Sequence, residues 1–162
     1  MTVLSIEQIT DPREIRRYLA GIGVWYRRWT QDGAPPARAV DSLLDWYQFE
    51  VQREKSAGGY RFADIVEIPP GPLSKSAQQF ERYHWHDDVE VRMIVCGGGS
   101  FYFHRDGKPE LVLSVGPGDY VSIGSPVQHK FVVDRAEGMT AIRLFRSDAG
   151  WQPNFVEEER EN

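Results

Sequence analysis

The sequence predicts a mostly β fold with helices at its N-terminal end, closed into a sandwich or barrel of the jelly-roll type. Three observations support this fold class. Apolar residues in the first third recur at helical spacing, whereas from Tyr60 onward they alternate with a period of two. Short runs of β-branched and aromatic residues follow one another in the second part. Glycine, proline and aspartate turn signals separate these runs, as is typical of all-β sandwiches and barrels.

The first predicted helix begins at Asp11. The side chain of Asp11 can cap free backbone N–H groups, Pro12 suits the first helical position, and Glu14 stands at the third. The apolar residues that follow at helical spacing are Ile15, Tyr18, Leu19 and Ile22. Gly21 and Gly23 are expected to end the helix.

A strand over 24–29 and a loop over 32–36 are expected before the second helix. This helix is predicted from about Arg38 to Lys55, and the Gly58-Gly59 pair stops it. Its apolar stripe consists of Val40, Leu43, Leu44, Tyr47 and Val51. We expect the stripe to pack the helix against the barrel.

The remaining strands are predicted from their alternating pattern. They are Phe62–Glu67, Tyr83–His86, Glu90–Val95, Gly99–Arg105, Glu110–Val115, Tyr120–Ile123, His129–Val133 and Thr140–Phe145. Turn signals lie at Pro69–Pro72, Asp106–Gly107 and Gly116–Asp119, and Asp-Gly is typical of two-residue hairpins. These eight strands are expected to form the barrel.

Length and charge indicate one soluble domain over residues 1–162. We expect a helical part over about 1–58, the barrel over about 60–155 and an acidic tail over 156–162. The net charge of -5 argues against nucleic-acid binding, which needs a basic surface. No apolar run approaches the roughly 18 residues of a membrane span, so no membrane association is expected. A monomer is expected because no long apolar face is left over.

The cellular compartment is predicted from two features. Residues Met1–Glu7 lack a basic segment, a long apolar segment and a small-residue cleavage site. The single cysteine, Cys96, cannot form a disulfide within the chain, so a reducing, cytoplasmic location is expected. Because Cys96 lies in an apolar run, we expect a buried thiol, with pairing to a second chain as the alternative.

One short segment carries the strongest functional signal. His84 and His86 are two residues apart, so on a strand both imidazoles point to the same face. Glu90 and Arg92 share this parity. Two imidazoles and a carboxylate on one face suit a metal site with open positions for substrate and oxygen. His129, on a later strand, supplies a third imidazole, so the pattern predicts metal binding.

Neighbouring residues have more than one interpretation. On the ligand face, Arg92 either clamps an anionic substrate or forms a salt bridge with Glu90 or Asp88 that orients the site, and both roles are compatible. Asp87 and Asp88 form a solvated corner, or one of them supports a histidine from behind. His104 precedes a hairpin tip, so we expect it to be exposed and to have no metal role.

At this point the residues resemble a known family. The His-x-His-x3-Glu pattern over 84–90, followed by Gly97, resembles the first motif of the cupin superfamily. The segment 118–129 resembles the second motif. The finer pattern, with Asp88 inside the corner and Glu-x-Arg leading into an apolar strand, is similar to acireductone dioxygenases of methionine salvage. The similarity continues over 23–29, 97–102, 116–123, 140–145 and 150–151.

The resemblance implies a cupin (jelly-roll) β-barrel and one Fe²⁺ or Ni²⁺ ion per chain. The metal ligands that it implies are His84, His86, Glu90 and His129. It also implies that Arg92 is a catalytic residue near the substrate dianion, with Arg143 as a weaker candidate for the same role. The phenylalanines Phe101, Phe103 and Phe131 either line the methylthio end of the substrate or simply belong to the core.

The implied reaction joins dioxygen to 1,2-dihydroxy-3-keto-5-methylthiopentene. With iron the implied products are 4-methylthio-2-oxobutanoate and formate. With nickel they are 3-methylthiopropanoate, formate and carbon monoxide. The implied partners are therefore this small molecule and O₂.

The sequence departs from the family pattern in three places. Gly124-Ser125-Pro126 reverses the usual Pro-x-Gly order, and Lys130 stands where bacterial members often carry an aromatic residue. The C-terminal end is also somewhat short. Two alternatives therefore stay open: another cupin dioxygenase or isomerase acting on a different enolisable compound, and a non-catalytic cupin that senses or stores a metal or small molecule.

Overall fold

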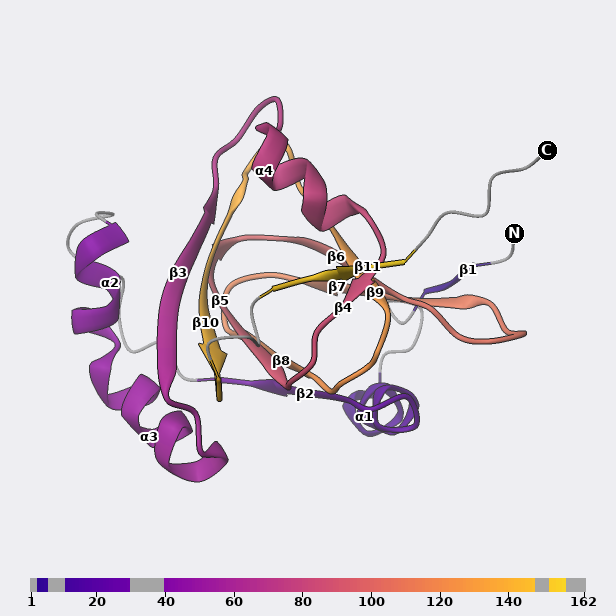
Figure 1. Ribbon diagram of the computed structural model, residues 1–162, viewed down its shortest axis with the longest axis horizontal. Helices are drawn as coiled ribbons and strands as arrows, with labels where there is room; N and C mark the ends of the chain where they lie inside the picture. The colour runs from indigo at the N-terminus through magenta and orange to yellow at the C-terminus, as the bar shows by residue number, and fades with distance from the viewer. Residues whose placement is uncertain (1–2, 6–10, 30–39, 148–151, 157–162) are drawn as a thin grey trace.

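The computed structural model describes residues 3–5, 11–29, 40–147 and 152–156 and folds them into two β-sheets (Figure 1). The six-stranded sheet has the order β1 (Val3–Ser5), β7 (Glu110–Val115), β6 (Gly99–Phe103), β9 (His129–Val133), β4 (His84–Trp85) and β11 (Asn154–Phe155). The five-stranded sheet has the order β2 (Val24–Arg28), β8 (Asp119–Ile123), β5 (Glu90–Gly97), β10 (Met139–Phe145) and β3 (Phe62–Ile68). All neighbouring strands are antiparallel except β1 and β7. The predicted mostly β, jelly-roll arrangement is confirmed.

Helices lie outside the two sheets. They are α1 (Pro12–Ala20), α2 (Val40–Trp46), α3 (Gln48–Gly58), α4 (Lys75–Gln78) and the short 3-10 helix η2 (Gln79–Glu81). In Figure 1, α2 and α3 lie beyond β3 on the outer side of the five-stranded sheet, and α1 lies near the end of β2. None of the helices in the described residues is long and apolar enough to cross a membrane.

The first helix forms as its sequence predicts. The carboxylate of Asp11 accepts a hydrogen bond from the backbone N–H of Arg13 at 2.9 Å, and Pro12 occupies the first helical position. Gly23 follows the helix with a φ of 84°, a left-handed conformation that favours glycine. Strand β2 begins directly after this turn, at Val24, and pairs with β8. The predicted helix and the strand after it are confirmed.

The second predicted helix is two helices, and this corrects the prediction of one continuous helix. The chain leaves helical geometry at Tyr47, where φ is -99° and ψ is 22°. The ring of Tyr47 is buried against Trp29, with 5.1 Å between the ring centroids and an edge-on arrangement. We attribute the bend to this contact. An apolar stripe read along one straight helix does not show where a large ring turns inward, so the sequence pattern did not predict the bend. Helix α3 runs to Gly58, past the predicted end at about Lys55, and Gly59 in a left-handed conformation ends it at the predicted glycine pair.

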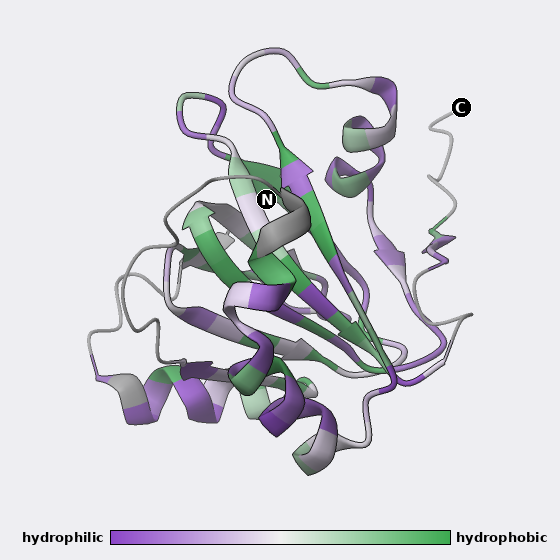
Figure 2. Ribbon diagram, turned by 90° about the vertical axis from the view of Figure 1, so that its left-hand side faces the viewer, coloured by the Kyte–Doolittle hydropathy of each residue, from purple (hydrophilic) through white to green (hydrophobic). Residues whose placement is uncertain are grey.

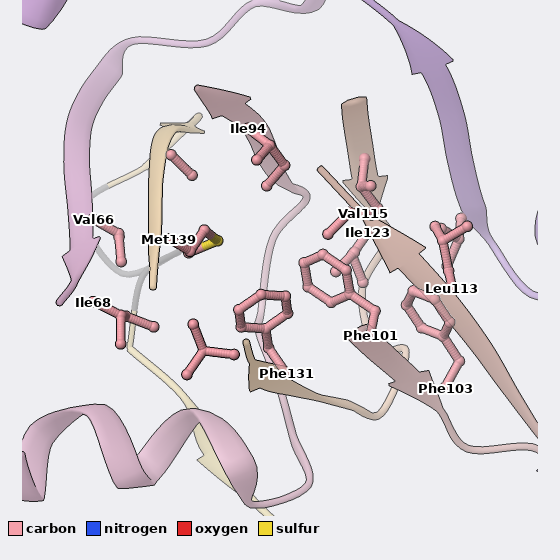
Figure 3. Close-up of a cluster of buried hydrophobic side chains, with 14 of the residues drawn as sticks. Val66, Ile68, Ile94, Phe101, Phe103, Leu113, Val115, Ile123, Phe131 and Met139 are labelled. Carbon is pink, nitrogen blue, oxygen red and sulfur yellow. The ribbon is translucent and has the colours of Figure 1, made fainter. Parts of the chain in front are cut away.

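Two apolar clusters cover both faces of the five-stranded sheet. The inner cluster lies between the sheets and includes Ile94 of β5 together with Phe101, Phe103 and Phe131 (Figure 3). The outer cluster packs α2 and α3 onto the sheet and includes Val91, Met93 and Val95 of the same strand. Figure 2, which looks toward these helices, shows hydrophobic residues along the strands and hydrophilic residues over much of the helices. Because β5 is buried on both faces there, Val91 and Met93–Val95 are all apolar.

The eight predicted barrel strands are confirmed with ends that differ by at most two residues. Sequence analysis missed β1, β11, α4 and η2. Each of these has four residues or fewer, which is too short to show a period. The predicted loop over 32–36, the start of the second helix at 38–39, the similarity over 150–151 and the tail over 157–162 lie outside the described residues.

The thiol of Cys96 is exposed, which corrects the prediction that it is buried. The pairing between β5 and β10 shifts register: Cys96 is opposite Thr140, whereas Ile94 is opposite Ala141. This β-bulge inserts one extra residue, Val95, so the inward and outward alternation changes at that point. Cys96 therefore faces the outer side of the sheet, and a regular alternating pattern could not reveal this.

Candidate metal centre

The three predicted histidines converge between the two sheets. His84 on β4 and His129 on β9 are registered directly opposite each other, and His86 follows β4. Their ligand atoms all lie within 4.8 Å of one another, and all three side chains are buried. Ring centroids are 4.5 Å apart for His84 and His129, and 5.2 Å apart for His84 and His86. The strand parity that the sequence predicts thus brings these imidazoles to one place.

Backbone carbonyls fix two of the rings. Nδ1 of His84 lies 2.7 Å from the carbonyl oxygen of Arg82, and Nδ1 of His129 lies 2.9 Å from that of Val127. Since a carbonyl only accepts, Nδ1 must donate in both cases, and the lone pair of each ring is then on Nε2. This orientation is the one that a histidine ligand needs.

Glu90 reaches the histidines from the other sheet. Its side chain is fully buried, and its Oε2 lies 2.7 Å from Nε2 of His86 and 3.9 Å from Nε2 of His129. Adjacent ligand atoms around a six-coordinate divalent ion with bonds of about 2.1 Å are separated by about 3.0 Å. The short separation of Glu90 and His86 therefore suits two neighbouring ligands of one ion.

Several polar atoms at this point are buried without a hydrogen-bond partner in the described part of the chain. They are both ring nitrogens of His86, Nε2 of His129, both carboxylate oxygens of Glu90 and Nε of Arg92. The close contacts of Glu90 are ion-pair distances that lack hydrogen-bond angles. Buried polar atoms normally have partners, because leaving them unsatisfied costs about 1–3 kcal/mol each. A cation bound among them would satisfy the lone pairs, so the donor set fits a divalent metal.

Burial and charge keep these groups in the forms that bind a cation. Burial lowers the pKa of His84, and it lowers the pKa of His129 to about 3, so both imidazoles are neutral near pH 7. Burial alone would raise the pKa of Glu90. The charge of Arg92 and the contact with His86 outweigh burial, and the pKa of Glu90 lies well below its usual value. The site therefore offers neutral imidazoles and an ionised carboxylate.

Arg92 forms the salt bridge that was one of its two interpretations. Its Nη2 lies 2.5 Å from Oε1 of Glu90, and its side chain is 5% exposed. Burial lowers the pKa of Arg92, while Glu90 opposes this effect. The guanidinium also lies over the ring of Phe80, 5.4 Å from the centroid. Arg92 thus orients Glu90, and the anion-clamp role stays a prediction.

The two weaker substrate candidates lie in different surroundings. Arg143, registered opposite Arg92, binds Asp64 in a bidentate ion pair at 2.8 and 2.6 Å. It also lines a cavity of about 350 Å³ beside the histidines. Phe131 is 4% exposed and packs against Phe101, with 4.8 Å between the ring centroids, inside the core between the sheets (Figure 3). Contact of either residue with substrate stays a prediction.

The cavity brings in residues that sequence analysis did not single out. Besides Arg143, His84 and His86, its walls come from β3, from the α4–η2 segment and from the residues before β11, and they comprise Ile65, Val66, Glu67, Ser76, Gln79, Phe80 and Pro153. No local motif marks these residues. They meet because the short α4–η2 segment, which connects β3 to β4, lies near the ends of β3 and β10 (Figure 1) and η2 contacts β9.

The remaining polar residues of the motif lie outside the cluster. Asp87 is exposed, and Asp88 accepts a hydrogen bond from the backbone N–H of Val89 at 2.7 Å. His104 is exposed and lies 3.0 Å from the carboxylate of Asp106. Asp87 therefore fits a solvated corner, Asp88 caps the backbone of that corner, and the predicted exposure of His104 is confirmed.

Comparisons with known proteins agree with this geometry. The model of the ARD/ARD' family matches residues 50–153. Acireductone dioxygenases from Parvibaculum lavamentivorans and Marinobacter nauticus are each 34% identical to the chain; the alignments cover 96% and 98% of it and 91% and 92% of the relatives. The solved structure of acireductone dioxygenase from Bacillus anthracis, with a cadmium ion in its active centre, superposes with a TM-score of 0.79, at 25% identity and 91% coverage of both chains.

These matches confirm the resemblance and the cupin fold on which it depends. They cover nearly the whole chain, and the relatives are named as enzymes of one kind. The departures noted at Gly124-Ser125-Pro126 and Lys130 do not break the match, since both lie inside the family segment. The chain belongs to the acireductone dioxygenase (ARD/ARD') family.

Proposed function

We propose that the chain is a metal-dependent dioxygenase that cleaves 1,2-dihydroxy-3-keto-5-methylthiopentene in methionine salvage. His84, His86, Glu90 and His129 would hold one Fe²⁺ or Ni²⁺ ion. The convergence of three buried imidazoles and one ionised carboxylate carries the proposal. When bound, such an ion supplies a Lewis acid that favours an enediolate and permits electron transfer to O₂.

Charge balance supports a doubly negative substrate. Glu90 pairs with Arg92, and Asp64 pairs with Arg143, so these four charges cancel. A divalent ion among neutral histidines would leave two positive charges in a buried place. A substrate dianion would neutralise them, and burying opposite charges together is far less costly than burying either alone.

The protein groups would bind and orient the substrate. The Nε of Arg92, buried and without a hydrogen-bond partner in the described residues, is a donor suited to an anionic oxygen. Ile65, Val66, Phe80 and Pro153 give the adjoining cavity an apolar side that suits an alkyl-thioether chain. The cavity walls would also exclude water from the reacting atoms.

Oxygen uptake and product analysis test the proposal. Metal-free protein is reconstituted with Fe²⁺ or with Ni²⁺ and mixed with the enediol under air. We expect uptake with both metals, with formate and the 2-oxo acid from the iron form and carbon monoxide from the nickel form. Uptake with other enediols but not with this one would point instead to a different cupin dioxygenase. Metal binding without uptake would point to a non-catalytic cupin.

A further inference from the structure

Strand β4 holds His84 through very little backbone pairing. It has two residues, meets β9 at the single registered pair of His84 and His129, and meets β11 at two pairs. A ladder this short gives the strand little orientation of its own. The backbone N–H of Val156 also donates a hydrogen bond to the carbonyl of Tyr83 at 3.1 Å, and side-chain contacts beside the strand can add to this pairing in keeping His84 opposite His129.

Four residues supply such contacts on the outer face of the six-stranded sheet. Nζ of Lys130 lies 5.0 Å from the ring centroid of Tyr83 and 5.0 Å from that of Tyr102. Tyr102 is registered directly opposite Lys130, and the hydroxyl of Tyr83 donates a hydrogen bond to Glu110. We call these four residues the outer clasp. It joins the residue before β4 to β9, β6 and β7.

The outer clasp is connected to the metal site through strand geometry. Tyr83 precedes His84 and Lys130 follows His129 in the chain. Because neighbouring side chains on a strand point to opposite faces, a contact between Tyr83 and Lys130 outside fixes the two histidines inside. All four clasp residues are half-buried, so solvent screens the attraction between the ammonium and the rings only in part.

We propose that Lys130 is a positioning residue that keeps His84 and His129 at the separation that metal binding needs. The inference rests on the proposed function, since it takes these histidines as ligands. The charge matters because a cation can attract two rings at once, one on each side.

Metal affinity of the full chain tests the proposal. Lys130→Met keeps an apolar stem and removes the charge, and we expect it to weaken Co²⁺ binding about tenfold, as is typical for groups that support a metal ligand from behind. The affinity is measured on metal-free protein by competition with a chromophoric chelator. Lys130→Arg should restore it. Lys108→Met, at an exposed hairpin tip, is the matched control and should bind as wild type does.

A double-mutant cycle distinguishes a shared contact from two separate effects. Tyr83→Leu removes the aromatic partner of Lys130. The double variant should therefore lose less Co²⁺ affinity than the product of the fold losses in the two single variants. The cobalt absorption spectrum should change in both single variants, because ligand orientation changes. If Lys130→Met does not fold, Lys130→Gln replaces it.

The outcomes separate this inference from the proposed function. Wild-type Co²⁺ affinity in the folded Lys130→Met or Lys130→Gln variant would overturn the role of Lys130 and leave the proposed function intact. A change in unfolding free energy without a change in Co²⁺ affinity would overturn it equally. A wild-type chain that binds no Co²⁺ would overturn the proposed function, and this inference with it.

Discussion

At the residue scale, His84 and His129 each use Nδ1 for a hydrogen bond to the backbone and direct Nε2 toward the candidate metal centre. The carbonyls of Arg82 and Val127 take the Nδ1 protons of His84 and His129. Both hydrogen bonds are made with the carbonyl of the residue two positions earlier, so the local backbone fixes the orientation of each imidazole ring. Neutral rings with one outward lone pair favour coordination over proton transfer, which would need a pKa nearer to neutral pH.

Removing either of these histidines should abolish metal binding and activity together. We expect His84→Ala and His129→Ala to lower metal affinity by at least about a hundredfold, because a supporting group alone is worth ten- to a hundredfold and a ligand is worth more. Metal content after dialysis and turnover per chain are the measurements. His104→Ala, which removes the exposed histidine, is the control and should retain both. Full occupancy with normal turnover in either ligand variant would contradict the assignment.

Arg92→Lys tests whether the guanidinium does more than hold Glu90. Lysine keeps the charge but loses the planar fork, so a bidentate contact should weaken while a simple charge effect should persist. We expect unchanged metal content and a kcat/KM at least tenfold lower, about 1.4 kcal/mol. Arg135→Lys, at an exposed position, is the control. Normal kcat/KM would show that Arg92 serves only the structure.

At the element scale, one buried carboxylate joins β2 to the turn before β8. Asp119 accepts hydrogen bonds from the hydroxyl of Tyr26 at 2.6 Å, from Arg28 at 2.7 Å and from the backbone N–H of Gly116 at 2.8 Å. Burial, together with Asp119, raises the pKa of Tyr26 to about 12. Because β8 is also paired with β5, this contact connects the sheet edge to the strand that carries Glu90.

Asp119→Asn should therefore destabilise the fold without removing a site residue. We expect the free energy of unfolding to fall by about 2 kcal/mol, since a charged acceptor with three donors is replaced by a neutral amide. Urea unfolding of the metal-free chain measures this. Tyr26→Phe removes only one of the donors and should cost about 1 kcal/mol. Equal stability of Asp119→Asn and wild type would contradict the role of this carboxylate.

The sequence predicted the elements whose apolar residues follow a repeating pattern and missed the elements that are too short to show one. The barrel strands have alternating apolar residues and α1 has an N-terminal capping residue, and these elements form where predicted. The bend at Tyr47 and the bulge beside Cys96 each depend on one contact or one register shift, which no local pattern records. The three histidines could be predicted because parity on a strand decides the face. The cavity wall at Phe80 could not, because it depends on where the short helical connection between β3 and β4 packs against the sheets.

At the scale of the whole molecule, the candidate metal centre links the two sheets. His84 and His129 belong to the six-stranded sheet, whereas Glu90 belongs to the five-stranded sheet. An ion bound by all of them should stabilise the fold, by about 2.7 kcal/mol when its concentration is a hundred times the Kd. The same groups make the metal-free fold sensitive to acid.

The stability of the metal-free chain should decrease between pH 7 and pH 5. His129 has a folded pKa of about 3 against 6.5 in the unfolded chain, so the unfolded state binds more protons over this range and gains population as the pH falls. For His129 alone the loss is on the order of 2 kcal/mol. The lowered pKa of His84 acts in the same direction. Glu90, with its pKa well below the usual value, adds a further loss of stability below about pH 4.5.

Urea midpoints at pH 7 and pH 5 measure the loss of stability, and His129→Asn should reduce it because the variant lacks the titrating ring. A stability that stays constant between these pH values, or a slope that His129→Asn leaves unchanged, would show that burial of this imidazole does not control the acid response.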